Sequence, residues 1–335
     1  MKQPFAFIHI LLLVTCAYAN AAVVLQYHHV SDDTPTITSI SPKDFHAHMD
    51  YLHEKRFNVI SIEQLIKTLD SNQTIPDKSV VITFDDAYRN IIDNAVPTLK
   101  HYGFPATIFV ATSLVGSSSY YLDWAQLRHL QDSGFTMANH TVTHTNLLQM
   151  QPNENKKMWL QRLTKEIEDA QKDLKKHLGV TQRIFAYTYG EYDRDVANLV
   201  RKLGYIAFGQ QSGPIGKSAD TVILPRFPLS GAYTDLSEFR TKVATIAFPL
   251  EDRFIDPVTT ESRPSLKLTL VDKNKSLAGI ACYGPGGPMH IEHVNAQTII
   301  TTSVKDIPVG RSRYNCTLRH HSGRYYWFSQ TWIHK

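Results

Sequence analysis

The chain has 335 residues, of which 42% are hydrophobic and 20% are charged, and its formal net charge is +4. This length exceeds the usual single domain of about 100 to 200 residues, so we expect one large domain and one small one. The balance of apolar and charged residues fits a globular protein and excludes a disordered chain. Because the net charge is small and no run is dense in lysine or arginine, the sequence gives no support to nucleic-acid binding.

The amino terminus has the pattern of a secretory signal. Lys2 precedes an apolar stretch at 5–14, and small residues follow at Ala17, Ala19, Ala21 and Ala22. This apolar stretch is too short to span a bilayer. We therefore predict a signal peptide over 1–21, a periplasmic or secreted protein, and no transmembrane segment after signal removal. A lipoprotein with a lipid anchor at Cys16 is the alternative, although Thr15 before that cysteine is atypical.

The two other cysteines, Cys282 and Cys316, would lie in a compartment where disulfides persist. We expect them to pair. Such a bond would stabilise a small terminal domain by on the order of 3 to 4 kcal/mol in the chain-entropy account. Two buried free thiols are the alternative.

Strand and helix patterns alternate from residue 23 to about residue 245. Short, largely apolar runs predict strands at 23–27, 59–62, 79–83, 106–110, 135–138, 184–187, 205–209 and 221–224. Amphipathic stretches predict helices that begin near Ser41 and Ser61, and helices over 90–101, 123–132, 154–178 and 193–203. This alternation predicts a parallel sheet, and about seven strands would be enough for a barrel, although spacing alone does not establish closure.

The pattern changes after about residue 249. Helical periodicity ends, and β-branched or aromatic runs at 266–271, 280–283, 298–303, 313–318 and 325–333 are separated by turn-rich stretches. We therefore predict a small all-β sandwich, an accessory domain over 249–335.

Two short motifs contain the candidate catalytic and metal-binding residues. Asp85 and Asp86 close the apolar run at 79–84, and His140 and His144 follow the strand predicted at 135–138. Successive side chains of an extended chain point in opposite directions, so one carboxylate could bind a metal while the other acts on a water. The two histidines would share a face if the turn between them is helical. Two neutral imidazoles and one carboxylate form a common ligand set for zinc and related ions. A paired-acid turn that caps the next helix is the alternative for the two aspartates.

These motifs resemble those of the NodB homology domain, the polysaccharide deacetylases of carbohydrate esterase family 4. The sequences TFDDAY at 83–88 and HTVTH at 140–144 match its first two motifs, and 105–110 and 185–193 give supporting matches. The resemblance implies a distorted (β/α) barrel over 22–248. It also implies an enzyme that removes acetyl groups from N-acetylglucosamine units, with an N-acetylated glycan as its partner.

The resemblance further assigns roles to individual residues. It implies that Asp85 is the general base and that Asp86, His140 and His144 hold a divalent metal, usually Zn²⁺. It implies that the backbone amide of Tyr189 helps to form the oxyanion hole.

The segment Tyr27-His28-His29 offers a candidate acid for the leaving amine. In the branch of this family that acts on poly-N-acetylglucosamine, a Tyr-His pair near the mature amino terminus supplies that histidine, so the resemblance implies His28. His29 is the rival, and a merely structural turn is a third interpretation. A neighbouring carboxylate would tune the acid, and Asp32 and Asp33 are the candidates by sequence.

The chain departs from the family pattern in its third motif. Ala186 stands where many members carry arginine. Arg226 is the candidate that replaces this charge beside Asp85.

Two other functions fit part of the pattern. A catalytically silent glycan-binding protein on the same fold would tolerate loss of metal ligands, whereas all four key side chains are present here. A glycoside hydrolase would use Asp85 and Asp86 as its acid pair. Adjacent acids rarely straddle a glycosidic bond at the roughly 5 to 9 Å that this chemistry needs, and the two histidines would have no role.

Overall fold

The computed structural model describes residues 21–71, 73–217, 219–251 and 254–335. The predicted signal peptide, apart from its last residue, and Cys16 therefore lie outside the described residues. Within the described ranges, no helix has the length and apolar character needed to cross a membrane.

The first part of the chain forms a curled sheet of mostly parallel strands. The strand order is β10-β1-β5-β6-β7-β8-β9, with β4 beside β5 and β11 beside β1. Among the described pairings of this sheet, only that of β10 with β1 is antiparallel. The strands are β1 (Ala21–Tyr27), β4 (Asn58–Val59), β5 (Ser79–Asp85), β6 (Thr107–Val110), β7 (Thr136–Asn139), β8 (Ile184–Ala186), β9 (Ile206–Phe208), β10 (Ile215–Gly216) and β11 (Phe227–Pro228).

A short segment after β9 joins the two edges of this sheet. Leu224 forms a parallel bridge with Phe208 of β9, and Phe227 of β11 pairs in parallel with Leu25 of β1. The strand predicted at 221–224 is wrong, because the structure has a turn there that ends in the single bridge at Leu224. Pro225 has no backbone N–H and cannot extend that ladder.

The predicted helices are present, and their first residues explain where they begin. Ser41 caps α1 (Pro42–Glu54), and Ser61 and Gln64 form a capping box for α2 (Ile62–Asp70). The helix predicted over 90–101 is divided into a π-helical turn and α3 (Val96–Tyr102). Pro97 lacks a backbone N–H, which favours the start of a new helix here. The remaining predicted helices are α4 (Trp124–Asp132), α5 (Lys156–Leu178) and α6 (Arg194–Lys202), and α7 (Leu236–Val243) was not predicted.

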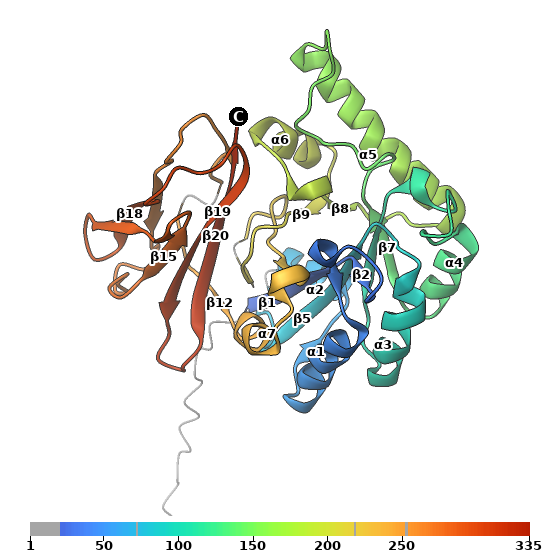
Figure 1. Ribbon diagram of the computed structural model, residues 1–335, viewed down its shortest axis with the longest axis horizontal. Helices are drawn as coiled ribbons and strands as arrows, with labels where there is room; N and C mark the ends of the chain where they lie inside the picture. The colour runs from blue at the N-terminus through green and yellow to red at the C-terminus, as the bar shows by residue number, and fades with distance from the viewer. Residues whose placement is uncertain (1–20, 72, 218, 252–253) are drawn as a thin grey trace, which may run out of the picture.

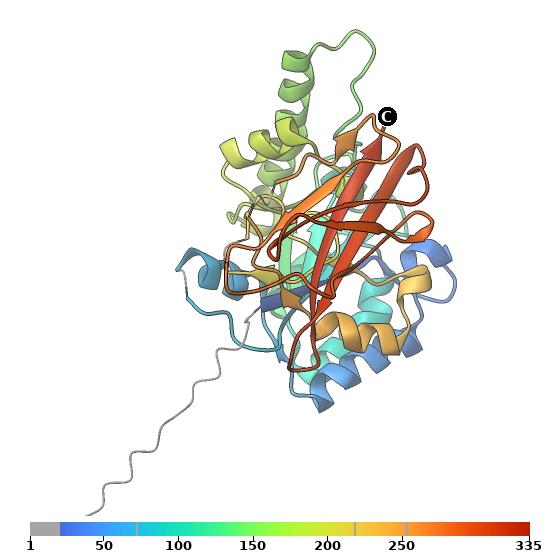
Figure 2. The same cartoon turned by 90° about the vertical axis from the view of Figure 1, so that its left-hand side faces the viewer.

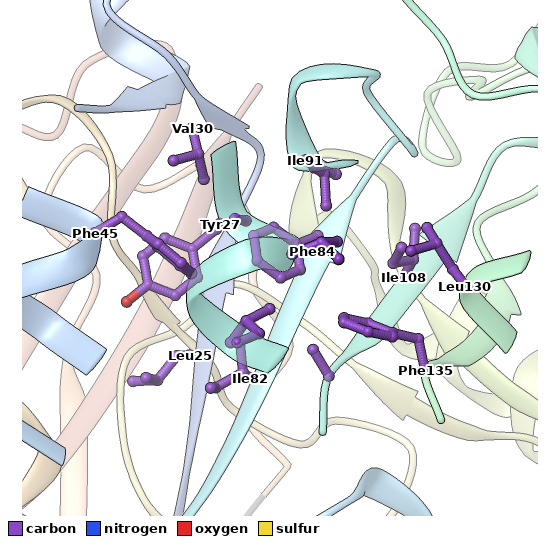
Figure 3. Close-up of a cluster of buried hydrophobic side chains, with 14 of the residues drawn as sticks. Leu25, Tyr27, Val30, Phe45, Ile82, Phe84, Ile91, Ile108, Leu130 and Phe135 are labelled. Carbon is purple, nitrogen blue, oxygen red and sulfur yellow. The ribbon is translucent and has the colours of Figure 1, made fainter. Parts of the chain in front are cut away.

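Alternation along the strands gives the sheet two apolar faces. On the outer face, side chains of β1, β5 and β6 pack against helices α1, α3 and α4 (Figure 3). Tyr27 lies at the centre of this cluster, with ring centroids 5.1 Å from Phe45 and 5.6 Å from Phe84. The alternate side chains of β1 and β5, such as Val24 and Val81, point to the inner face of the curled sheet. They belong to a second apolar core, which also includes residues of α2. The same alternation places the side chains of residues 26 and 28, at the end of β1 and just after it, on the inner face of the sheet. It does the same for the side chains of residues 83 and 85 in β5.

After α7, the described part of the chain contains strands joined by turns and loops, and no helix. One sheet has the order β12-β20-β19-β15-β16 with β13 beside β20, and the other has the order β14-β18-β17. Side chains of both sheets meet in one apolar core, which includes Leu266, Ile299, Tyr314 and Trp332. The five predicted strands correspond to β14 (Leu266–Thr269), β15 (Ala281–Gly284), β18 (Thr298–Thr302), β19 (Gly310–Arg319) and β20 (Tyr325–His334). Four shorter strands were not predicted: β12 (Ile246–Ala247), β13 (Val258–Thr259), β16 (Gly287–Pro288) and β17 (His290–His293).

The C-terminal strands lie against the parallel sheet (Figure 1). In Figure 2 the red strands β19 and β20 cross in front of it. The ring of Trp327 in β20 meets that of Phe227 edge-on, with centroids 5.4 Å apart. Arg324, at the start of β20, donates to the Asp77 carboxylate at 2.7 Å and to the Ala244 carbonyl at 2.6 Å.

The expected pairing of Cys282 with Cys316 is confirmed, because a disulfide joins β15 to β19 at paired positions of the sheet. It closes a loop of 34 residues around the core of the C-terminal strands. Loop closure restricts the unfolded chain, which is where most of the stabilisation arises in the chain-entropy account.

Replacing both Cys282 and Cys316 by alanine should lower the free energy of unfolding by about 3 kcal/mol. Urea unfolding followed by tryptophan fluorescence measures this change. A reductant should destabilise the native chain to a similar extent and leave the double variant unchanged. Equal stability of the two oxidised proteins would show that the cross-link adds nothing.

Candidate metal and catalytic site

Asp85 is the last residue of β5, and its carboxylate is fully buried on the inner face of the sheet. The Arg226 guanidinium holds both oxygens: Nη1 donates to Oδ1 at 2.7 Å and Nη2 donates to Oδ2 at 2.9 Å. The Gln26 amide also donates to Oδ2, at 2.6 Å. Arg226 is itself fully buried and donates its Nε to the Gly209 carbonyl at 2.9 Å. The carboxylate is therefore fixed in one orientation by a two-pronged ion pair.

This environment keeps Asp85 ionised. Burial alone would raise the pKa of Asp85, because a charged carboxylate loses its hydration. The positive charge of Arg226, the nearby histidines and the hydrogen bond from Arg226 oppose burial and hold the pKa well below its ordinary value. Asp85 is therefore an ionised carboxylate at neutral pH.

Asp86, His140 and His144 converge beside Asp85. The Asp86 Oδ1 atom lies 3.5 Å from His140 Nε2 and 3.2 Å from His144 Nε2, and the three potential ligand atoms all lie within 4.8 Å of one another. The same Oδ1 atom is buried and has no hydrogen-bond partner. A buried carboxylate oxygen without a partner is costly, and a cation between these three groups would satisfy it. The donor set therefore fits a divalent metal ion.

The surroundings of both histidines favour the neutral imidazole that can bind a metal. His140 Nδ1 lies 2.8 Å from the Ala186 carbonyl, so its N–H donates there and Nε2 keeps its lone pair toward Asp86. Burial lowers the pKa of His140 to about 3 and also lowers that of His144. Metal ligation requires neutral imidazole, which is the form that burial favours.

The turn between the two histidines is not helical. Residues 140–144 form an irregular bend in which Thr141 has φ 69° and His144 has φ 56°. Glu166 of α5 holds this bend, because its carboxylate accepts from the Thr143 backbone N–H at 3.0 Å and from the Thr143 hydroxyl at 3.1 Å. The two imidazole rings still meet edge-on, with centroids 4.9 Å apart.

Strained backbone concentrates at this site. In the part of the chain that the structure describes, eight non-glycine residues have positive φ, and five of them belong to the three loops here: Asp86, Ala87, Thr141, His144 and Tyr189. Each such conformation costs on the order of 1 kcal/mol and persists only where its surroundings enforce it. The loops are therefore held in shape by their contacts and not by local propensity.

His28 and His29 lie on opposite sides of the chain. His28 follows Gln26 on the inner face, and its Nε2 lies 3.9 Å from Asp85 Oδ2. His29 is buried elsewhere, with its ring stacked on Tyr88 at 3.7 Å and its Nδ1 2.9 Å from the amide of Asn90. Burial, with a smaller contribution from His28, lowers the pKa of His29 to about 4. Of the two histidines, His28 is the one that faces the predicted base.

Asp32 and Asp33 are wrong as the partners of His28. Both side chains are exposed, and the carboxylate near His28 is Asp85. The pairing of β1 with β5 brings Asp85 to this place, and nearness in sequence could not predict it.

Tyr189 lies in the turn Thr188–Gly190, directly after β8. Its ring meets the His144 ring edge-on, with centroids 4.7 Å apart, and its side chain is 41% exposed. The structure thus brings all seven predicted site residues to one end of the parallel strands, with Ala186 contributing only its backbone carbonyl.

Sequence reasoning missed two residues at the site. Gln26 had a usable signal, since it is a polar residue in the otherwise apolar start of β1 and falls on the same side as His28. Arg311 of β19 donates to the Tyr189 carbonyl at 2.7 Å, and no feature of the sequence connects these two distant segments.

Parts of the chain are similar in sequence to known proteins. Residues 72–208 match the family model described as polysaccharide deacetylase. The poly-β-1,6-N-acetyl-D-glucosamine N-deacetylase of Staphylococcus epidermidis is 27% identical over 234 residues, which cover 63% of this chain and 80% of that protein. The putative polysaccharide deacetylase YxkH of Bacillus subtilis is 27% identical over 182 residues, or 54% of this chain. The chain matches 61% of the length of that relative.

Solved structures share the fold of the parallel sheet and its helices. The Streptococcus pyogenes deacetylase PplD, in complex with acetate, has a TM-score of 0.59 at 23% identity and covers 67% of this chain and 98% of its own. IcaB from Ammonifex degensii has a TM-score of 0.58 at 22% identity and covers 67% of this chain and 96% of its own. Residues 72–208 therefore belong to the polysaccharide deacetylase family, and the solved structures share the fold.

Proposed function

We propose that the protein is an exported, metal-dependent N-deacetylase that hydrolyses the N-acetyl group of N-acetylglucosamine units in a glycan. The observation that carries this proposal is the ionised, buried Asp85 beside the convergent donors of Asp86, His140 and His144. The similarity to staphylococcal poly-β-1,6-N-acetyl-D-glucosamine N-deacetylases supports poly-β-1,6-N-acetylglucosamine as the first substrate to test.

The metal would be held by Asp86, His140 and His144, and we propose Zn²⁺, which suits a carboxylate and two imidazoles. When bound, it would polarise the acetamide carbonyl and increase the acidity of a water. Asp85 accepts the proton of the attacking water, since Arg226 and Gln26 keep its carboxylate ionised and aimed into the site.

Two further groups complete the reaction. The Tyr189 backbone N–H donates to the oxygen that becomes negative in the transition state. His28 donates a proton to the leaving amine, and its place 3.9 Å from Asp85 puts it on the side of the site where the base acts. Arg226 supplies the buried charge that Ala186 cannot.

The proposed domain boundary lies where the chain changes from alternating strands and helices to strands alone. We assign 22–248 to the catalytic unit and 249–335 to an accessory β-sandwich whose two sheets share one core. The pattern at 1–21 supports export to the periplasm or the medium, with a lipid anchor at Cys16 as the alternative. A catalytically silent glycan-binding protein is the rival function, and acetate release distinguishes it.

Asp85→Asn should reduce kcat for acetate release by about 10²- to 10⁴-fold, because the variant has no carboxylate to take the water proton. Acetate and free amine released from a β-1,6-linked N-acetylglucosamine oligomer measure the effect. Since Asn leaves the Arg226 charge buried without a counter-ion, the double variant Asp85→Asn/Arg226→Met serves as a stability control. Acetate release at the native rate by Asp85→Asn would contradict the mechanism.

Removal of divalent metal with a chelator should abolish acetate release, and added Zn²⁺ should restore it. Metal content per chain, measured by elemental mass spectrometry, should fall in His144→Ala. His46→Ala is the matched control, because His46 Nε2 lies 3.5 Å from an Asp50 oxygen on an exposed helix surface. Full activity after complete metal removal would refute metal dependence.

His28→Gln should lower kcat by about 10²- to 10⁴-fold while metal content stays at the native level, because the leaving amine loses its proton donor. His29→Gln should keep most of the native kcat once its melting temperature has been checked, since His29 is buried away from Asp85. A larger loss of kcat in His29→Gln than in His28→Gln would reverse the assignment.

A further inference from the structure

One arginine of the C-terminal strands contacts the turn that carries Tyr189. Arg311 of β19 donates from Nη1 to the Tyr189 carbonyl at 2.7 Å, and its Nε lies 3.4 Å from Glu191 Oε1. A single guanidinium therefore binds both the backbone and a side chain of the same turn. The same strand contributes Tyr314 and Cys316 to the apolar core of the C-terminal strands.

The same turn is tied to the loop that follows the predicted metal ligand His144. The Thr188 hydroxyl donates to the Thr145 carbonyl at 2.5 Å, and the Asn146 amide donates to Glu191 Oε2 at 2.9 Å. Glu191 thus joins Asn146 on one side to Arg311 on the other. Arg311 is therefore connected, through the Glu191 side chain, to the segment that follows His144.

Tyr189 needs anchors on both sides, because its backbone is held at φ 58°. This conformation costs a non-glycine residue on the order of 1 kcal/mol or more. The peptide that carries the Tyr189 N–H is held by the Glu191 N–H, which donates to the Thr188 carbonyl at 3.1 Å. The next peptide is held by the Gly190 N–H, which donates to the Tyr187 carbonyl at 2.9 Å, and by Arg311. Without Arg311, the Tyr189 carbonyl and the Glu191 carboxylate lose their partner on β19, so the turn that carries the Tyr189 N–H is held less firmly.

We propose that Arg311 is a positioning residue, which holds the Tyr189 turn from the C-terminal strands so that the accessory region completes the oxyanion site. This inference rests on the proposed N-deacetylase function. It assigns the accessory strands a part in the chemical step in addition to any contact with substrate.

Arg311→Ala should lower kcat by about tenfold while KM changes little, because the N–H that it positions acts mainly in the transition state. Arg311→Lys keeps one cationic donor and should recover part of the lost kcat. Arg319→Ala is the matched control, an exposed arginine on the same strand, and should behave as the native protein. A raised KM with native kcat in Arg311→Ala would overturn the proposal in favour of direct substrate contact, and native values of both would overturn it outright.

A second measurement separates this inference from the function on which it rests. Hydrogen exchange of residues 187–193, measured by mass spectrometry on the full chain, should be faster by about tenfold in Arg311→Ala and unchanged in Arg319→Ala. If the native chain releases no acetate, the proposed function fails while faster exchange still supports the anchoring contact. Unchanged exchange in a folded Arg311→Ala would overturn the anchoring even in an active enzyme.

Glu191→Gln supplies a variant of the same size for the case in which Arg311→Ala does not fold. It removes the charge that Arg311 faces and should lower kcat in the same direction by a smaller factor. The double variant should lose less than the product of the two single effects, since both residues act on one turn. Independent, multiplicative effects would count against the proposal.

Discussion

The buried ion pair of Asp85 and Arg226 is the interaction on which the site and the closure of the sheet both depend. Taking two charges out of water is costly, and the cost is offset only by good geometry and further hydrogen bonds. Arg226 meets this condition with two bonds to Asp85, one to Gly209 and a position 5.1 Å from the Phe109 ring centre. It lies on the segment that joins β9 to β1, so the same residue fixes the base and ties the sheet edges together.

The ion pair also separates the roles of two adjacent carboxylates. The positive charge of Arg226 balances the negative charge of Asp85, so Asp85 stays ionised without any metal. Asp86 has no such partner, and burial, together with the Asp85 charge and against the opposing charge of His28, raises its pKa to about 6. Neighbouring acids whose environments push their pKa values apart commonly divide the work of a site. Here Arg226 keeps the Asp85 carboxylate ionised, while the unpartnered oxygen of Asp86 is satisfied best by a cation.

Sequence patterns predicted the parts of this structure that local physics determines. Alternation along β5 and the capping residues Ser41 and Ser61 gave strands and helices close to their observed bounds. The failures have tertiary causes. The bend between the two metal-site histidines is set by Glu166 of α5, and the carboxylate near His28 arrives through strand pairing. The family resemblance supplied roles for Tyr189 and Arg226 that spacing alone did not contain.

Three arginines near the C-terminal end of the chain donate hydrogen bonds to the region of the parallel sheet, with backbone carbonyls among the acceptors. Arg311 binds the Tyr189 carbonyl, and Arg324 binds the Ala244 carbonyl. Arg313 binds the Ser212 hydroxyl at 3.0 Å. A carbonyl is present whatever side chain the residue carries, so loop side chains can change while the backbone stays anchored. Such an arrangement lets the C-terminal strands hold the Tyr189 turn by its backbone, whatever side chains the loop carries.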